Sequence, residues 1–261
     1  FNNQIVDLDK KIKIDKEKFI FSGADLRKRQ HAFGISIEDL EMILHPMAED
    51  AKEAVGSMGD DTPLAVLSDR YRPLYHFFRQ NFSQVTNPPI DSLRENKVMS
   101  LKTRFGNLGN ILNFDKLTKD NIYVLESPIL SNSQFSKFIK FFGQNSKTID
   151  CTFLHNNSLV ESLDKIIKES EIAVRQGATQ LVLTDIAVSE EKIAIPMLLC
   201  VGAINKHLIK KKLRGYVSIN VQTGEALDTH SFATILGVGA TTINPYLALD
   251  SLYQRYEKKL F

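Results

Sequence analysis

The segment Gln180-Leu-Val-Leu-Thr-Asp-Ile186 decides the fold class of this chain. Its nearly continuous apolar run is typical of a strand that is buried on both faces in a parallel sheet. A helix is predicted before it, from the capping pattern Ser158-x-x-Glu161 to the terminal glycine Gly177. Another helix is predicted after it, where Pro196 suits a first helical turn. The segment is therefore expected to be one strand of a βαβ unit.

The same alternation extends to the C-terminus. Strands are predicted over residues 148–153, 180–186, 216–221 and 240–244. Helices are predicted from Ser158 to Gly177, from Pro196 to Lys212, from the cap Asp228 to about Leu236, and from Tyr246 to Lys259. Four alternations of strand and helix indicate an α/β protein of parallel βαβ units with right-handed crossovers. A half barrel and an open sheet both fit, and we favour an incomplete barrel-like arrangement.

The N-terminal portion, residues 1–112, is predicted to be mostly helical. A Lys-rich lead over residues 1–18 precedes a helix capped by Ser36. Pro46 disfavours helix at His45 and suits the start of the next helix. A short strand is expected over residues 64–67, and helices over residues 75–82 and 91–101.

Two loops in this portion have an unusual composition. The first is Gly56-Ser-Met-Gly-Asp-Asp-Thr-Pro63, and the second is Gln84-Val-Thr-Asn-Pro-Pro89. Neither shows helical or strand periodicity, and both are rich in turn-forming residues. The polar segment 113–121 is the predicted connection between this portion and the βαβ portion, residues 122–261.

Composition limits the function classes. Of 261 residues, 43% are hydrophobic and 25% are charged, which is typical of soluble globular proteins. A net charge of +2 is too small to indicate nucleic-acid binding. No apolar run is long enough to span a membrane, and no signal peptide opens the chain. Cys151 and Cys200 lie in apolar surroundings and are expected to be reduced, which favours a cytoplasmic protein.

The polar candidates for chemistry do not form a complete catalytic site. Asp60 and Asp61 are adjacent carboxylates that could position a metal or act as acid and base, although a turn role is commoner. None of the six histidines has metal-ligand spacing to another. Cys200 and His207 could share a helix face, but a buried thiol and a surface histidine are the simpler expectation.

Two glycine-rich runs are also interpreted as structural. The run Gly237-Val-Gly239-Ala-Thr-Thr242 matches a dinucleotide-binding fingerprint only at its first two glycines, and it precedes a strand instead of following one. A helix end followed by a tight turn explains these glycines better. The run Gly106-Asn-Leu-Gly-Asn110 offers backbone N–H groups but lacks the Lys and Ser/Thr of a phosphate loop, so a structural turn is expected.

Several long motifs carry a family resemblance. The runs Asp39–Asp50 and Gly56–Ser68 resemble the central domain of the glutamate synthase large subunit. The resemblance continues at residues 79–91, 99–110, 183–186, 223–226 and 243–248, so it extends over nearly the whole chain. By this resemblance, residues 1–261 together form one such central domain.

The resemblance implies a function for the parent enzyme. Glutamate synthase, a cytoplasmic oxidoreductase of ammonia assimilation and amino-acid biosynthesis, makes two glutamates from glutamine and 2-oxoglutarate. Its N-terminal glutaminase domain releases ammonia with a terminal cysteine, and its synthase domain carries FMN and an iron–sulfur cluster. This chain starts at Phe1, has two cysteines, and shows no flavin-site segment. It is therefore expected to be an excised central domain, inactive alone, with no cofactor or metal of its own.

The resemblance also implies candidate site residues. The expected partners are the glutaminase and FMN-binding synthase domains of the same polypeptide, and ammonia needs a shielded passage between them. Small or neutral side chains, a flexible methionine and a loop anchored by two carboxylates suit that surface. The candidates are Ser57, Met58, Gly59, Asp60, Asp61, Thr86 and Asn87. A plain turn or interface role for both loops is an equal alternative. The alternative for the whole chain is a stand-alone barrel-like module that binds phosphate or flavin at its strand ends.

Overall fold

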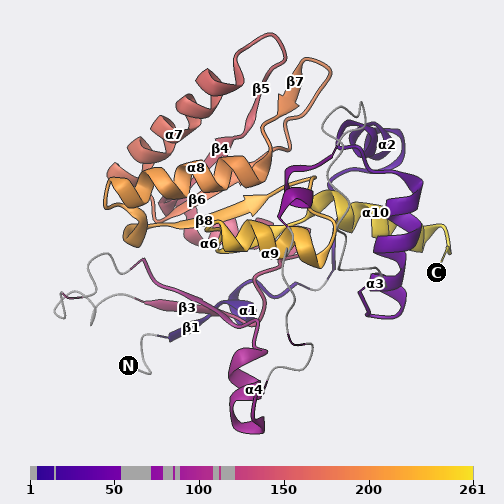
Figure 1. The fold of residues 1–261 in the computed structure, drawn as a ribbon, viewed down its shortest axis with the longest axis horizontal. Coiled ribbons are helices and arrows are strands. Elements are labelled where there is room, and N and C mark those ends of the chain that lie inside the picture. Colours follow the sequence, from indigo (N-terminus) through magenta and orange to yellow (C-terminus); the bar gives the residue numbers. More distant parts are fainter. Residues whose placement is uncertain are drawn as a thin grey trace.

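The computed structural model describes residues 5–14, 16–53, 72–78, 85, 89–107, 112 and 121–260. Its centre is an all-parallel sheet with the strand order β4-β6-β8-β9 (Figure 1). The strands are β4 (Ser146–Asp150), β6 (Gln180–Thr184), β8 (Ser218–Gln222) and β9 (Thr242–Asn244). The fold is therefore α/β with parallel βαβ units, as predicted.

Three helices cover one face of this sheet. They are α7 (Leu159–Arg175), α8 (Met197–Lys210) and α9 (Thr229–Gly237) (Figure 1). Alternate strand residues such as Leu181, Leu183 and Ile219 face these helices and share one buried core with them. The capping predictions hold, because Ser158 Oγ accepts the Glu161 N–H (3.5 Å) and the Asp228 carboxylate accepts the Ser231 N–H (2.8 Å). The pattern of the βαβ portion therefore places its core correctly.

The other face of the sheet packs against an aromatic helix that the sequence pattern did not predict. Helix α6 (Asn132–Phe142) begins with a capping box at Ser131 and buries Phe135 and Phe138. These rings contact Val182 on the far side of β6. Helix α10 (Tyr246–Glu257) closes the chain, and no helix of the described residues is long and apolar enough to cross a membrane.

A second sheet joins the start of the chain to two strands from the region 103–125. Strand β3 (Ile122–Leu125) pairs in parallel with β1 (Ile5–Asp7) and antiparallel with β2 (Thr103–Phe105). Helix α1 (Leu8–Lys11) follows β1, and its Leu8 packs in the aromatic cluster of α6. Strands on either side of segment 113–121 thus belong to one sheet, and the predicted division of the chain there stays a prediction.

The predicted strand 148–153 is two strands. Strand β4 ends at Asp150, and β5 (Thr152–Leu154) pairs antiparallel with β7 (Lys192–Ala194). The change occurs at Cys151, whose N–H donates to Thr184 O (2.8 Å) while its carbonyl accepts the Ile195 N–H (2.9 Å). The strand therefore leaves the parallel sheet and enters a short ribbon, which a one-dimensional pattern does not reveal.

The prediction that Pro46 disfavours helix at His45 is wrong. The prediction that it suits the start of the next helix is confirmed, because Pro46 lies in the first turn of the helix that begins at His45. The π-helical turn η2 (Asp39–Leu44) leads directly into α3 (His45–Glu49), and His45 has helical dihedral angles of φ −62° and ψ −51°. The His45 N–H donates to Leu40 O, five residues earlier. A π turn is wider than an α turn and therefore accommodates the proline ring without a break. Ser36 does begin this helix, because its hydroxyl accepts the Asp39 N–H (3.1 Å).

The remaining N-terminal helices are shorter than predicted or lie elsewhere. Helix α2 (Gly23–Ala32) packs on α10, η3 (Leu74–Phe77) is a single 3-10 turn, and α4 (Ser92–Val98) ends before the predicted Leu101. The predicted strand 64–67 and residues 79–82 of a predicted helix lie outside the described residues. Two further 3-10 turns are η4 (Gly143–Asn145) and η5 (Arg214–Tyr216).

A single parallel bridge extends the main sheet beyond β9. Ile129 bridges Ile243, with the Leu130 N–H donating to Ile243 O (2.8 Å). Within the described part of the chain, no pairing connects this segment to β4 at the opposite edge, so the sheet is open there. The barrel-like curvature stays a prediction.

Candidate functional site

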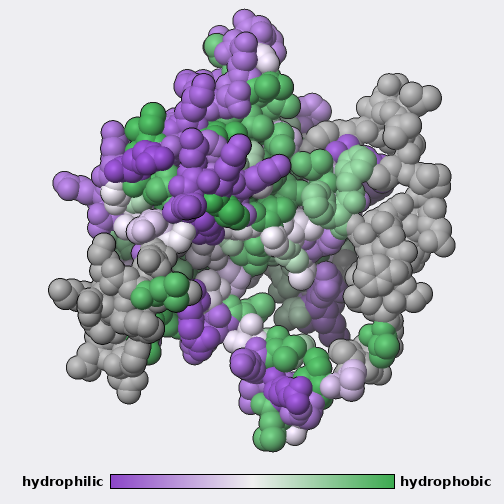
Figure 2. Space-filling model, turned by 60° about the vertical axis from the view of Figure 1, so that its left-hand side comes forward, coloured by the Kyte–Doolittle hydropathy of each residue, from purple (hydrophilic) through white to green (hydrophobic). Residues whose placement is uncertain are grey.

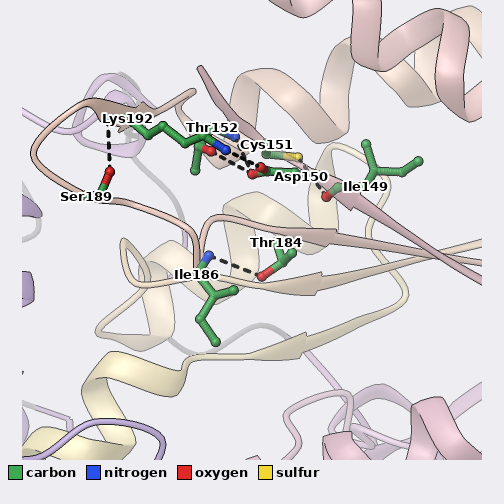
Figure 3. Close-up of polar contacts among 8 residues, drawn as sticks. All are labelled: Ile149, Asp150, Cys151, Thr152, Thr184, Ile186, Ser189 and Lys192. Carbon is green, nitrogen blue, oxygen red and sulfur yellow. Dashed lines mark hydrogen bonds and ion pairs between the residues drawn. The ribbon is translucent and has the colours of Figure 1, made fainter. Parts of the chain in front are cut away.

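Polar side chains gather where the parallel strands end. Asp150 follows Ile149 at the end of β4, and it accepts the Thr152 hydroxyl (2.7 Å) and Lys192 Nζ (3.4 Å). Figure 3 shows these contacts, and it also shows that Thr184 Oγ1, at the end of β6, accepts the Ile186 N–H (3.3 Å). The carboxyl ends of parallel strands are where ligands bind in open α/β sheets. A functional site is therefore expected at this edge of the sheet.

Asp185 is the most enclosed acid at this edge. Its side chain is fully buried and accepts the Thr223 hydroxyl (2.5 Å) and the Gly224 N–H (3.1 Å). Burial raises the pKa of Asp185 to about 6, although these two hydrogen bonds oppose the shift. The residue therefore clamps the loop after β8 to the end of β6.

Glu225 stands two residues beyond Thr223 in that loop. Its carboxylate accepts the Met197 N–H (2.8 Å) at the start of α8. Pro196, which was predicted inside the first turn, is the residue before the helix, and its ψ of 123° is extended. Burial, together with the negative charge of Asp185, raises the pKa of Glu225 to about 8. Glu225 is therefore a helix cap that is largely protonated at neutral pH.

The two cysteines lie in the same core. Cys151 and Cys200 are fully buried and both are free thiols. A hydrogen bond to Cys151, together with burial, raises the pKa of the Cys200 thiol. Since the thiolate is the reactive form, Cys200 is a poor nucleophile.

The N-terminal portion closes over this edge. The Phe33 ring lies so close to Gly224 that a Cβ there would be 2.7 Å from it. Arg29 Nη1 donates to Ile186 O (2.9 Å), and its guanidinium stacks 3.6 Å from the Phe21 ring. The edge that binds ligands in many α/β proteins is thus covered by side chains of the same chain.

Tyr75 makes a second attachment at this edge. Its hydroxyl donates to Glu225 O (2.9 Å), and the His230 ring lies 3.0 Å from Tyr75 O. Residues 72–78 stand in the sequence between the two unusual loops. The described segment that separates the loops is therefore fixed to the loop after β8.

All the predicted passage residues lie outside the described residues. This applies to Ser57, Met58, Gly59, Asp60, Asp61, Thr86 and Asn87. Their role therefore stays a prediction.

The other candidates from the sequence lie in turns or make contacts between helices. Helix α9 ends at Gly237, and Gly239 has a φ of 127°, which confirms the turn that was preferred over a nucleotide site. His207 Nε2 of α8 pairs with Glu171 of α7 (2.5 Å), and both side chains are mostly buried between the two helices. No group of three potential metal ligands occurs among the described residues. Asn107 has a φ of 51°, as in a turn, while residues 108–110 are outside the description.

The sequence reasoning missed Asp185 and Glu225 as interacting groups. Both occur in quoted family motifs, Leu183–Ile186 and Thr223–Ala226. A usable signal was present, because Asp185 comes directly after β6, Glu225 lies in the loop after β8, and parallel strands end at one edge. The hydrogen bonds of Asp185 with Thr223 and of Glu225 with Met197 depend on the path of the loop after β8, which no sequence pattern specifies.

Comparisons with known proteins agree with the quoted motifs. Residues 28–261 match the family model of the glutamate synthase central domain. The chain is 55% identical over 241 residues to the glutamate synthase [NADPH] large chain of Azospirillum brasilense, covering 91% of this chain and 16% of that protein. It is 43% identical over 244 residues to ferredoxin-dependent glutamate synthase 2 of a Synechocystis species, covering 91% and 16%.

A third relative gives the same proportions. The glutamate synthase [NADPH] large chain of Bacillus subtilis is 41% identical over 235 residues, covering 90% of this chain and 15% of that protein. The chain thus spans 15% to 16% of the length of these relatives. The match over residues 28–261 and these identities place the chain in the glutamate synthase central domain family.

Proposed function

We propose that this chain is a non-catalytic central domain that connects the glutaminase and FMN-binding synthase domains of a cytoplasmic glutamate synthase. The observation that carries the proposal is the family match across residues 28–261 in relatives several times longer than this chain. The parent enzyme makes glutamate from glutamine and 2-oxoglutarate. FMN and the iron–sulfur cluster would belong to the synthase domain.

The covered sheet edge supports a non-catalytic role. The Phe33 ring fills the space over Gly224. The carboxylate oxygens of Asp185 accept hydrogen bonds from the Thr223 hydroxyl and the Gly224 N–H. A stand-alone module that binds phosphate or flavin would need this edge open to solvent. The arrangement favours a connecting domain over that alternative.

We further propose that the two unusual loops help to form the ammonia passage. Ammonia must cross between domains without protonation, so a narrow path lined by neutral groups is required. Ser57, Met58, Gly59, Thr86 and Asn87 have suitable side chains. Asp60 and Asp61 would anchor the first loop through backbone N–H groups. Support comes from Tyr75, which fixes the segment between the loops to Glu225 O.

The test is substitution in the full-length enzyme. Met58→Trp or Thr86→Trp should narrow the passage. Glutamine hydrolysis should continue, while the rate of 2-oxoglutarate consumption falls by about tenfold or more. A tenfold fall corresponds to an increase of about 1.4 kcal/mol in the activation free energy. Val160→Trp, at an exposed position of α7, is the matched control. The measurement is the ratio of glutamine hydrolysed to 2-oxoglutarate consumed. A ratio that stays at the wild-type value in both variants would refute the passage.

A further inference from the structure

A cleft of about 590 Å³ lies at the amino-terminal ends of strands β8 and β9. It is bounded on one side by residues 100–107, which include β2, and on the other by the segments that lead into β8 and β9. Figure 2 brings this side of the molecule forward, and the surface there is hollowed between the body and the lobe of α4. Clefts of about 300–1,000 Å³ are typical of sites for small organic ligands. The cleft lies at the edge of the sheet opposite to the covered one.

Arg214 is held in the wall of this cleft by neutral groups. Its Nε donates to Asn205 Oδ1 of α8 (2.8 Å). Its Nη1 and Nη2 donate to the carbonyl oxygens of Val217 (2.6 Å) and Gly239 (2.8 Å). A guanidinium has five N–H donors, so two donors of Arg214 remain. The three bonds fix the planar group in one orientation before a ligand arrives, which lowers the entropy cost of binding.

The positive charge of Arg214 is not balanced within the described part of the chain. The side chain is half-buried, and no carboxylate of a described residue pairs with it. Burial lowers the pKa of the Arg214 guanidinium, and no charged neighbour contributes to that shift. The group still keeps its proton at neutral pH. A half-buried cation that contacts only neutral acceptors is unfavourable, and an anion in the cleft would offset this desolvation.

The other groups around the cleft suit an anion that has an apolar part. Arg104 of β2 also lines the cleft, is exposed, and makes no ion pair within the described residues. Lys102 pairs with Glu126 (2.6 Å), so it adds little net charge. No carboxylate of the described residues lines the cleft. The rest of the lining is mostly apolar and includes Leu101, Phe105, Pro128, Val217 and Leu236.

We propose that this cleft binds a small phosphate ester, whose phosphate contacts Arg214 and Arg104 and whose organic part contacts the apolar lining. Guanidinium groups match phosphate oxygens through paired, charge-assisted hydrogen bonds. The two unpaired positive charges balance a phosphate dianion, which a single carboxylate would not. The inference goes beyond the proposed function and does not depend on it, because the described lining includes neither of the two unusual loops.

Calorimetric titration of the full-length polypeptide with phenyl phosphate tests the ligand class. Inorganic phosphate and benzoate are the matched probes, since the first lacks the apolar ring and the second replaces the phosphate by a carboxylate. Phenyl phosphate should bind about tenfold or more tightly than either probe. Its affinity should also fall as salt is added, because ionic contacts are screened.

Three results of this titration would overturn the proposal. They are an absence of phenyl phosphate binding, an affinity for benzoate equal to that for phenyl phosphate, and an affinity for inorganic phosphate equal to that for phenyl phosphate. The second would remove the phosphate from the assignment, and the third would leave an adventitious ion only.

A pair of variants locates the binding. Arg104→Gln removes one guanidinium at an exposed position, and the affinity for phenyl phosphate should fall by about tenfold or more. Lys165→Gln removes the same charge at an exposed position of α7 outside this cleft, so the affinity should stay within about twofold of the wild type. An unchanged affinity in Arg104→Gln would overturn the site. Equal losses in the two variants would also overturn it, because they would indicate general attraction by the surface charge.

Arg214→Lys tests the fixed guanidinium. The variant keeps a positive charge but loses the planar group, so the affinity for phenyl phosphate should fall by about tenfold or more. The change also removes three internal hydrogen bonds, so circular dichroism must first show that the variant is folded. A folded variant with wild-type affinity would overturn the role of Arg214. If the variant does not fold, the comparison of Arg104→Gln with Lys165→Gln decides the proposal.

Discussion

The βαβ portion and the N-terminal portion are held together by apolar clusters of different size. In residues 122–260, helices α7 and α8 bury apolar side chains against continuous strands, and one core joins them. The N-terminal elements attach through two smaller apolar clusters. In one, Leu8 and Ile12 pack with the rings of α6, and in the other, Leu26 and Phe33 pack with Tyr246 and Leu247 of α10.

Hydrogen bonds add to these contacts. The Asp250 carboxylate of α10 accepts the Ile20 and Phe21 N–H groups (3.2 and 2.8 Å), and Tyr75 holds Glu225 O. Where no such attachment occurs, as at α4, the chain projects.

This difference shows which elements of the chain depend most on tertiary contacts for their position. Strands and long amphipathic helices form because their periodic apolar residues have an obvious partner face. Short polar helices such as α2 have a weak pattern. Helix α2 is positioned by one fully buried leucine, Leu26, together with hydrogen bonds from Arg29 and Gln30. The βαβ portion should therefore be sensitive to core changes, and the N-terminal portion to the loss of single anchors.

The largest expected effect concerns the aromatic cluster that links the two sheets. Phe138 is fully buried and contacts the Phe105 and Phe142 rings. Phe138→Ala should lower the free energy of unfolding by about 3–5 kcal/mol, because it leaves a cavity between α6 and Phe105 of β2. Denaturant unfolding of the chain measures this. The control Phe141→Ala, at a 42% exposed position, should cost far less. Equal costs would mean that α6 does not join the two regions.

The second expected effect is a pH dependence of the free energy of unfolding, which arises from Glu225 at the covered edge of the sheet. The pKa of Glu225 is raised to about 8, above its unfolded value near 4.5, so the folded state holds the proton more tightly. Stability from this group is full below pH 4.5 and is lost as the pH rises through 8. Between pH 6 and 8 the free energy of unfolding should fall by up to about 1.4 kcal/mol per pH unit.

A neutral variant tests the assignment. Glu225→Gln keeps an acceptor for the Met197 N–H but does not titrate, so the slope between pH 6 and 8 should flatten. Asp150→Asn, at the exposed end of β4, is the control and should keep the wild-type slope. Unfolding free energies measured at several pH values decide between them. An unchanged slope in Glu225→Gln would show that another group titrates.

The smallest expected effect concerns the anchor of the segment between the two loops. Tyr75→Phe removes the hydroxyl that donates to Glu225 O and should cost about 0.5–1.5 kcal/mol. Hydrogen exchange should report faster opening of residues 74–77, with the βαβ core unchanged. Tyr216→Phe, at a 47% exposed tyrosine, is the matched control. If both variants behave alike, the N-terminal attachment does not depend on this bond.

Much of the βαβ portion was predictable from its residues. The buried run at Gln180, the cap at Asp228 and the glycine end at Gly177 each depend on local chemistry, and each matches the structure. Helix α6 was missed, although its capping box at Ser131 is a local signal. The candidate loops stay predictions because Met58 and Thr86 lie outside the described residues.

The sequence by itself determined the alternation of strands and helices and, through its motifs, the family. Periodicity, caps and turns are encoded within a few residues, so they can be read locally. Only the tertiary structure decided that Cys151 ends one strand and that Phe33 covers Gly224. It also decided that Asp185 and Glu225 lie near enough at one edge of the sheet for the charge of Asp185 to raise the pKa of Glu225. These outcomes depend on contacts between residues far apart in the chain, which burial stabilises and local pattern does not encode.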